Sequence, residues 1–382
     1  MFNNLRELIL SMPDEKVCKK YLADQRWEGG KAICPYCGYG KCYHIENGKR
    51  YKCGSKECYK KFSVITGTVF EASNIPLVKW FTAIYLIASH KKGISSYQLG
   101  KDIGVTQKTG WFMLHRIREL MRPKETVKLD NIIEIDETYV GGIVGNMSKS
   151  KRAKLRTDNN GTIQNKTMVM GLLERGGNLK LIAMGKDNGV DVIQPLVRDN
   201  VDTDGVLITD GHFAYTGLAK EYAGHEVVNH KAEEYVRDGV IHTNSIEGAF
   251  SLLKRSIIGI YHQVTPKHLS RYCDETMYRY NSRKMKDADR FTLSLQQAEG
   301  RLTYKALVQR PETTEVIETV IDTTIERRGK KQPVIALQGG VIVGEYESIR
   351  DAARKTGIKF QMISRVLSGK KATCGGFVWK YA

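Results

Sequence analysis

The spacing of apolar residues changes several times along the chain, and these changes divide it into segments. Between residues 76 and 120, apolar side chains recur every three to four positions, which predicts helices. Residues 130–305 alternate strand-type and helix-type patterns, which is typical of an α/β domain. Residues 306–334 are polar and rich in threonine and charge, which predicts a linker before a compact C-terminal segment.

Within the helical region, residues 95–111 predict two helices joined by a tight turn at Gly104. This is the helix-turn-helix pattern, in which the second helix enters the major groove of DNA. Gln107, Lys108 and Thr109 begin that helix and would face base edges or phosphates. An ordinary helical hairpin is the alternative, because the pattern is short.

Two aspartates lie in strand patterns of the α/β region. Asp136 lies inside the apolar run 131–142, where a carboxylate is costly to bury unless it is paired or binds a cation. Strand patterns at 166–174 and 179–185 follow, joined by a hairpin signal, and then a helix pattern at 190–201. The next strand ends at Asp210, which would project beside Asp136 if the two strands are neighbours.

A helix predicted over 242–255 supplies a third acid. Glu247 and Lys254 lie on one face of this helix, beside an apolar stripe that faces the sheet. The order of these elements predicts a ribonuclease-H-like mixed sheet flanked by helices, with Asp136, Asp210 and Glu247 brought together. Three such carboxylates can bind two Mg²⁺ ions, and Lys254 would neutralise a phosphate nearby.

Each of these residues also has a simpler interpretation. Asp136 could pair with a lysine, Asp210 could cap the turn before Gly211, and Glu247 could pair with Lys254. Asn244, near the start of the helix, could contact the metal or cap the helix. All three acids in this order are a less probable coincidence than any one of them.

The net charge of the chain predicts a binding partner. Sixty Lys and Arg face 42 Asp and Glu, and the formal charge of +18 favours a polyanion such as nucleic acid, although solubility alone is an alternative. The segment 145–166 carries six basic residues against one Asp and predicts a mobile basic loop that grips DNA through Lys151, Arg152 and Lys154, or an unstructured insertion. No apolar run of about 18 residues predicts a membrane span.

The first 22 residues predict one amphipathic helix and lack the features of a secretory signal, so we expect an intracellular protein, cytoplasmic and associated with the nucleoid.

The cysteine pattern is that of a metal site. Cys34 and Cys37 form one close pair, and Cys53 and Cys58 form a second pair fifteen residues further on. Two such pairs on turn-forming sequence can place four thiolates around a structural Zn²⁺ ion, which predicts a zinc ribbon. Cys42 and His44 lie between the pairs without a paired spacing, and we expect them to be bystanders.

Several motifs resemble those of zinc-ribbon insertion-sequence transposases related to Merlin elements, over about residues 15–305. The motifs are Cys34-x-x-Cys37, the stretch 62–70 (FSVITGTVF), 135–142 (IDETYVGG), 209–211 (TDG), 242–248 (HTNSIEG) and Lys254-Arg255. The resemblance implies a metal triad of Asp136, Asp210 and Glu247 with Lys254 as the accompanying base. Some members of the group use asparagine as the third residue, which makes Asn244 the alternative.

The C-terminal segment has its own pattern: a strand at 341–346, helices at 348–357 and 361–367, and a final turn and strand at 375–381. It resembles the NUMOD-type DNA-binding modules that are attached to homing nucleases. Ser364, Arg365, Lys370 and Lys371 are the DNA contacts that we expect, and dimerisation is the alternative role.

These patterns predict a DNA transposase that cleaves the terminal inverted repeats of its element and joins the freed 3′ ends to target DNA. The alternatives are an endonuclease that cuts without joining and an inactive regulator derived from a transposase. We expect two catalytic Mg²⁺ or Mn²⁺ ions, structural Zn²⁺, double-stranded DNA as the partner, and a homo-oligomer on DNA. The predicted parts are an N-terminal helix and zinc ribbon (1–70), a helix-turn-helix region (71–125), a catalytic domain (126–305), a linker (306–334) and a DNA-binding module (335–382).

Overall fold

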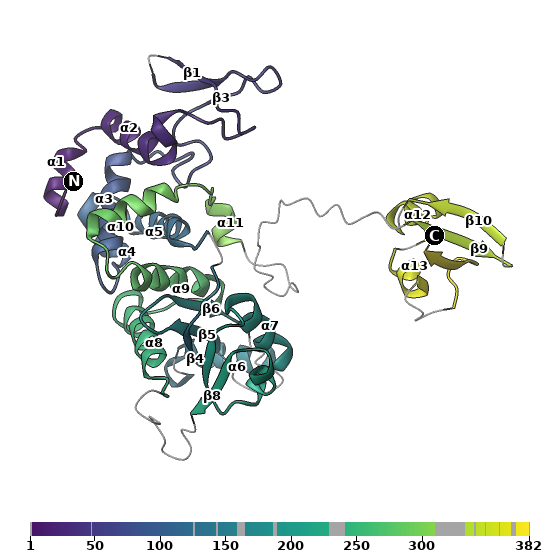
Figure 1. Cartoon of the computed structure of the whole chain (residues 1–382). Helices are drawn as coiled ribbons and strands as arrows, with labels where there is room; N and C mark the ends of the chain where they lie inside the picture. The colour runs from purple at the N-terminus through teal and green to yellow at the C-terminus, as the bar shows by residue number, and fades with distance from the viewer. Residues whose placement is uncertain are drawn as a thin grey trace. The chain divides into compact units, whose positions relative to one another are not determined.

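In the computed structural model, the chain forms two compact units, Met1–Pro311 and Glu312–Ala382 (Figure 1). In the described parts, no helix is both long and apolar enough to cross a bilayer. The residues described are 2–46, 48–124, 127–142, 144–158, 165–185, 189–228, 241–309, 333–339, 341–347, 349–358, 360–367 and 372–381.

The N-terminal segment forms two helices, α1 (Leu5–Ser11) and α2 (Glu15–Arg26), where one was predicted. The prediction was wrong because Pro13 ends the first helix and Asp14 starts the second, its side chain accepting a hydrogen bond from the Val17 N–H. A 3-10 turn, η1 (Glu28–Gly30), leads into an antiparallel sheet of β1 (Cys42–Ile45), β2 (Arg50–Cys53) and β3 (Lys61–Phe62).

Three helices follow: α3 (Leu77–Ser89), α4 (Ser96–Ile103) and α5 (Gln107–Met121). The predicted helix pair and its tight turn are confirmed, since Gly104 ends α4 in the left-handed conformation with φ of 63°. Gly110 lets α4 and α5 approach closely, because a Cβ there would lie 2.7 Å from the Ser96 carbonyl oxygen.

The central sheet has the strand order β6-β5-β4-β7-β8. Strands β4, β5 and β6 pair antiparallel, whereas β7 and β8 run parallel to β4. This mixed topology confirms the predicted ribonuclease-H-like arrangement. The strands are β4 (Ile132–Gly141), β5 (Lys166–Glu174), β6 (Leu179–Ala183), β7 (Val206–Asp210) and β8 (Gly224–Val228).

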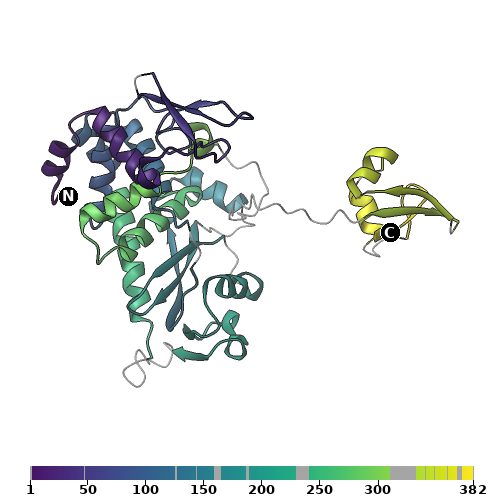
Figure 2. The ribbon, with the colours of Figure 1, turned by 45° about the horizontal axis from the view of Figure 1, so that its top comes forward.

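Helices cover both faces of this sheet (Figures 1 and 2). On one face, α7 (Val190–Asn200) and the 3-10 turns η3 (Phe213–Tyr215) and η4 (Leu218–Lys220) pack against Ile133 and Ile135. On the other face, α8 (Asn244–Ser256) and α9 (Pro266–Asn281) pack against Val169 and Leu173. A π-helical turn, η6 (Ile257–Tyr261), continues α8.

The segment predicted as a basic loop contains a 3-10 turn, η2 (Val144–Asn146), and a helix, α6 (Lys149–Asp158). The loop prediction was wrong over these residues. The stretch KSKRAKLRTD has no glycine or proline and is rich in residues that favour helix, so its high charge does not prevent helix formation.

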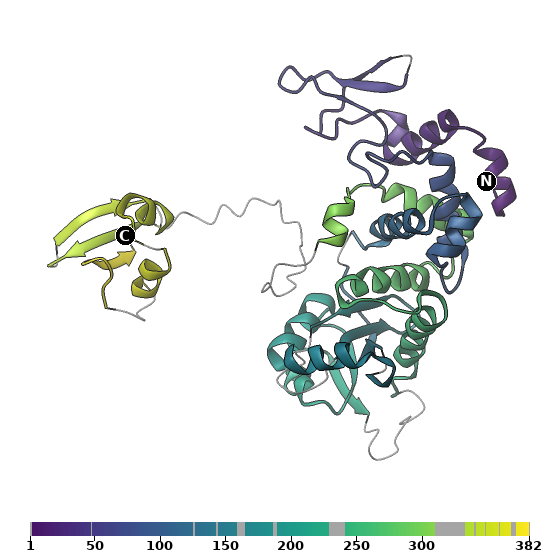
Figure 3. The same ribbon diagram turned by 180° about the vertical axis from the view of Figure 1, so that it is seen from behind.

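Helix α9 lies between the sheet and the helix-turn-helix region (Figure 3). The junction of α9 with α5 holds a buried ion cluster, in which Arg118 Nε lies 2.7 Å from Glu275 Oε2. Arg279 Nη1 donates to the other oxygen of Glu275 at 2.6 Å, and the Tyr261 hydroxyl donates to it as well. Helices α10 (Asp287–Gln296) and α11 (Tyr304–Val308) complete this unit, and Phe291 of α10 packs against Phe81 of α3.

The C-terminal unit is a three-stranded antiparallel sheet, ordered β10-β9-β11, with two helices. Its core includes Trp379, Ala352 and Ile363. The central strand β9 was missed, because its apolar run directly follows the polar segment assigned as linker. The elements are β9 (Val334–Gln338), β10 (Val341–Tyr346), α12 (Ile349–Thr356), α13 (Phe360–Leu367) and β11 (Val378–Tyr381).

Candidate active site and cysteine cluster

The parallel pairing of β4 with β7 brings two predicted acids side by side. Glu134 of β4 is level with Ile208 of β7, and continuing this register sets Asp136 level with Asp210. One carboxylate oxygen each of Asp136, Glu137 and Asp210 lies within 4.8 Å of the others. In the described part of the chain, no lysine or arginine forms an ion pair with these three carboxylates.

Burial and mutual repulsion alter the acidity of this cluster. Burial raises the pKa of Asp136 to about 7, and the charges of Glu137, Asp210 and Glu247 act in the same direction. Burial also raises the pKa of Glu137, although the hydrogen bond that its carboxylate accepts from the Tyr215 hydroxyl opposes this. Like charges held together without a counter-charge are the arrangement that a hard divalent cation compensates, so the residues present fit such an ion.

Of the simpler roles considered for Asp136, Asp210 and Glu247, the structure confirms only the turn cap by Asp210. Asp136 accepts a hydrogen bond from the Glu137 N–H at 2.8 Å and has no lysine partner within the described chain. Asp210 does cap the following turn, since its Oδ1 accepts from the His212 N–H at 3.0 Å. Glu247 and Lys254 form no ion pair with each other in the described structure, and both side chains are exposed on α8.

The third acid is placed differently from the first two. Glu247 is near enough for its charge to raise the pKa of Asp136, but it lies outside the tight group. Glu137 occupies that group, and sequence reasoning missed it. Asp136 and Glu137 are adjacent on β4, and adjacent residues of a strand point to opposite faces, so the sequence pattern does not predict that both reach one site. The structure shows that the Glu137 carboxylate lies near Asp210 and accepts a hydrogen bond from Tyr215.

The start of α8 is capped from another element. Its N-cap residue is Thr243, whose side chain makes no capping bond, and Asn244 is the first helical residue and so does not serve as the cap. Instead Glu134 Oε2 of β4 accepts hydrogen bonds from the Ser245 and Ile246 N–H groups, at 2.9 and 3.0 Å. The side chain of Glu134 is fully buried.

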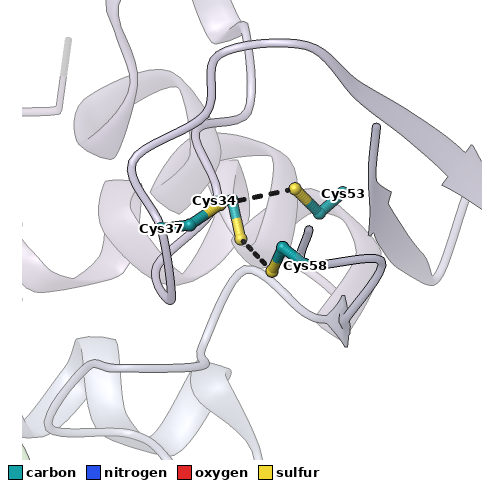
Figure 4. Close-up of side chains that lie close together, drawn as sticks. All are labelled: Cys34, Cys37, Cys53 and Cys58. Atoms are coloured by element: carbon teal, nitrogen blue, oxygen red, sulfur yellow. Dashed lines mark hydrogen bonds between the residues drawn. The ribbon is translucent and has the colours of Figure 1, made fainter. Parts of the chain in front are cut away.

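The four predicted zinc ligands converge in the ribbon (Figure 4). Cys34 Sγ lies 3.8 Å from Cys58 Sγ, and Cys37 Sγ lies 3.6 Å from Cys53 Sγ. A tetrahedral ion with Zn–S bonds of about 2.3 Å would hold its sulfurs about 3.8 Å apart, so the four thiols fit Zn²⁺. Cys42 and His44 lie outside the cluster, and the His44 ring is tilted against that of Tyr51, with the two centroids 4.6 Å apart.

The residues predicted to contact DNA are placed as follows. Gln107 and Lys108 are exposed at the start of α5, whereas Thr109 is half-buried and its hydroxyl lies 2.9 Å from that of Thr106. Lys151, Arg152 and Lys154 are on α6, where Lys154 is exposed and Arg152 is half-buried. Ser364 and Arg365 are on α13, and Lys370 and Lys371 lie outside the described residues.

Comparison with known proteins places this combination of a ribonuclease-H-like sheet, an acid cluster and a four-cysteine ribbon among the transposases. The profile of the ISXO2-like transposase domain matches residues 128–281, and that of the transposase zinc-ribbon domain matches residues 13–61. A relative from Halobacterium salinarum, an uncharacterized protein in transposable element ISH50, is 33% identical over 259 residues, which cover 65% of this chain and 84% of the relative. The chain belongs to the family of zinc-ribbon ISXO2-like transposases.

Two further comparisons concern the C-terminal unit and solved structures. The profile of the DNA endonuclease I-HmuI-like, NUMOD-like domain matches residues 334–380. The Mos1 strand transfer complex is 12% identical with a TM-score of 0.19, over 58% of this chain and 78% of that one. The pre-cleavage Mos1 transpososome is 12% identical with a TM-score of 0.18, over 55% and 75% of the two chains.

Proposed function

We propose that this transposase binds the terminal inverted repeats of its own element, cleaves DNA at the element ends and joins the freed 3′ ends to target DNA. The observation that carries the proposal is the cluster of Asp136, Glu137 and Asp210, which has no ion-pair partner among the described side chains. Membership of a transposase family and the charge of +18 support DNA as the substrate.

We propose that Asp136 and Asp210 hold Mg²⁺ or Mn²⁺, with Glu247, Asn244 or Glu137 completing the site. When bound, a pair of such ions activates the attacking oxygen and stabilises the leaving oxygen of an in-line displacement. Lys254, exposed two turns along α8 from Glu247, would hold a phosphate beside the cut. Zn²⁺ in the cysteine ribbon would have a structural role, because four protein ligands leave no open position.

Several modules would position the DNA, and their basic side chains support this role. The exposed Gln107 and Lys108 would contact the terminal repeat, and Arg152 and Lys154 of α6 the adjoining backbone. The C-terminal unit matches a domain described from a DNA endonuclease, which supports a further DNA contact by this unit. Two element ends must meet for joining, so we propose that the protein is a homo-oligomer on DNA.

The test uses the full chain, Mg²⁺ or Mn²⁺, a linear DNA that carries the sequences flanking the gene, and a supercoiled target plasmid. We expect 3′-hydroxyl ends at the repeat boundary and plasmid products joined to them. Asp136→Asn and Asp210→Asn should lower both products at least 100-fold while duplex binding persists. Asp199→Asn, at an exposed position of α7, is the matched control and should retain activity.

The same assay separates the alternative functions. Cleavage without joined products would favour an endonuclease, and duplex binding without cleavage would favour a regulator. Cleavage by Asp136→Asn at the wild-type rate would refute the acid site. Glu247→Gln, Asn244→Ala and Glu137→Gln, compared in parallel, would identify the third residue by the largest loss of both products.

A further inference from the structure

Glu134 is a buried acid outside the proposed metal cluster. It precedes Asp136 by two residues on β4, so both side chains leave the strand on the same face. Gly171, the ladder partner of Asp136, shows that this face lies beneath α8, since a Cβ on Gly171 would lie 2.6 Å from the Ile246 Cδ1 atom. Glu134 therefore points toward the helix that carries Asn244 and Glu247.

Both oxygens of Glu134 are occupied. Oε2 accepts the two N–H groups of the first turn of α8, while Oε1 lies 2.7 Å from Arg175 Nε and 3.4 Å from His242 Nδ1. A negative charge at a helix N-terminus is favoured by the helix dipole, and the Arg175 guanidinium compensates the buried charge. The carboxylate is thus satisfied within the fold and has little capacity left for a metal ion.

We propose that Glu134 is a positioning residue, which fixes the first turn of α8 against β4 and so sets where Asn244 and Glu247 stand relative to Asp136. The inference rests on the proposed function, because it concerns the same acid site. An aspartate or serine at the N-cap would satisfy the same N–H groups from within the helix. The carboxylate instead comes from the strand that bears Asp136, which ties the two sides of the site together.

A second set of bonds ties the segment before α8 to the same strand. Arg175, in the turn between β5 and β6, donates from Nη2 to the His242 carbonyl oxygen at 2.9 Å. The Arg175 backbone N–H donates to the Ile132 carbonyl oxygen of β4 at 3.0 Å. The entry to α8 and its first turn are thereby held on β4 by two routes, one through Glu134 and one through Arg175.

Two measurements on the full chain test this role. The first is hydrogen exchange without added Mg²⁺ or Mn²⁺, where Glu134→Ala should speed exchange of the Ser245 and Ile246 amides at least 10-fold. The second is Mn²⁺ binding followed by the free-ion electron paramagnetic resonance signal, counting only the sites that Asp136→Asn removes. Loss of a side chain that orients a metal ligand weakens affinity about 10- to 100-fold, and we expect a loss in this range for Glu134→Ala.

Two further variants separate positioning from simple loss of stability. Glu134→Gln keeps the side-chain volume and one carbonyl acceptor, so it should fold even if Glu134→Ala does not. It should keep part of the amide protection and weaken Mn²⁺ binding less than Glu134→Ala. Glu275→Gln removes a different buried, arginine-paired carboxylate and is the matched control. It should lower the unfolding temperature, but leave Mn²⁺ affinity and the exchange of Ser245 and Ile246 as in the wild type.

The outcomes distinguish this inference from the proposed function. Wild-type Mn²⁺ affinity in both Glu134 variants, when Asp136→Asn has lost the sites, would overturn the positioning role alone. Unchanged exchange of the Ser245 and Ile246 amides in the Glu134 variants would overturn it regardless of metal. If Asp136→Asn itself binds Mn²⁺ as the wild type does, the proposed metal site fails, and the exchange measurement still decides whether Glu134 holds α8.

Discussion

At the scale of single residues, the acid site is a place where the fold tolerates repulsion. Asp136 is half-buried beside two other carboxylates, and its pKa is raised to about 7. Such a group binds its proton more tightly in the folded chain than in the unfolded chain, where the pKa is near the ordinary 3.8. Without metal, the free energy of unfolding therefore falls as the pH rises from about 4 to about 7.

This effect predicts a stabilising substitution. At pH 8 without added Mg²⁺ or Mn²⁺, Asp136→Asn should increase the free energy of unfolding by about 1 to 3 kcal/mol, because it removes the repelled charge. At pH 5 the difference should be smaller, since Asp136 is then mostly protonated. Urea unfolding at the two pH values measures this difference. Burial also raises the pKa of Asp274 to about 6, but this residue contributes equally to the wild type and the variant. Equal destabilisation at both pH values would show that Asp136 is not repelled.

The sequence predicted some residues of the site and not others for a physical reason. Asp136 and Asp210 stand out because each is an acid in an apolar strand, a local signal. The roles of Glu134 and Glu137 depend on what lies opposite them, the N-terminus of α8 and Tyr215, which are distant in sequence. Asn244 was weighed as a helix cap on local chemistry, but a side chain from β4 does the capping.

At the scale of elements, the packing of α8 on the sheet depends on a glycine. Ile246 and the Phe250 ring occupy the space above Gly171 on β5, where a Cβ would approach the ring carbons to 2.7 Å. Helix α8 can therefore lie close to the strand opposite Asp136. The sequence predicted both elements, but their contact depends on a residue with no side chain, which apolar patterns do not reveal.

Gly171→Ala should accordingly destabilise the unit by about 1 to 3 kcal/mol, since the added methyl group displaces the side chains of α8. Gly248→Ala is the matched control on α8 itself, because a Cβ there meets no atom within 4 Å. It should stabilise the protein by up to about 1 kcal/mol through helix propensity. Thermal unfolding of both variants decides the matter, and a neutral Gly171→Ala would mean that α8 shifts without cost.

The ribbon depends on a different kind of contact. Its sheet packs one face on Trp27, whose ring centroid lies 5.2 Å from that of Tyr51, and the cysteine cluster holds its turns. Strands β1, β2 and β3 are only four, four and two residues long, so the bound ion would supply much of the folding free energy of the ribbon.

Cys53→Ser should therefore lower the zinc content below one ion per chain and change the near-ultraviolet circular dichroism of Trp27. Cys42→Ser should leave one zinc ion bound, because Cys42 lies outside the cluster. Elemental analysis of the purified full chain measures both. A full zinc content in Cys53→Ser, or a loss in Cys42→Ser, would require a different set of ligands.

At the scale of the whole molecule, the chain consists of two compact units. The composition change after residue 305 predicts a linker over 306–334, most of which lies outside the described residues, and the helix-turn-helix and ribonuclease-H-like patterns predicted the order of elements in the first unit. Strand β9 was missed because its apolar run directly follows the segment assigned as linker, and its pairing with both β10 and β11 identifies it as the central strand. Contacts between distant segments account for most of what the sequence did not predict.

If the two units fold independently, each should unfold separately. A chain ending at Pro311 should keep the unfolding temperature that the first unit has in the full chain, and it should still bind Mn²⁺. Its affinity for duplex DNA should decrease, with a shallower dependence on salt because fewer phosphates are neutralised. Calorimetry and fluorescence anisotropy measure these effects, and an unfolding temperature lowered by truncation would show that the units stabilise each other.

Within the first unit, the buried cluster of Arg118, Glu275, Arg279 and Tyr261 leaves little freedom between α5 and α9. Removing one partner of such a buried pair costs about 3 to 5 kcal/mol, so the cluster contributes strongly to the contact between α5 and α9. If α5 reads the DNA and the acid cluster cuts it, as proposed, the joint would fix the number of base pairs between the sequence that is read and the bond that is cut. Inserting five base pairs there would turn the cleavage site to the opposite side of the duplex, beyond the reach of the acids.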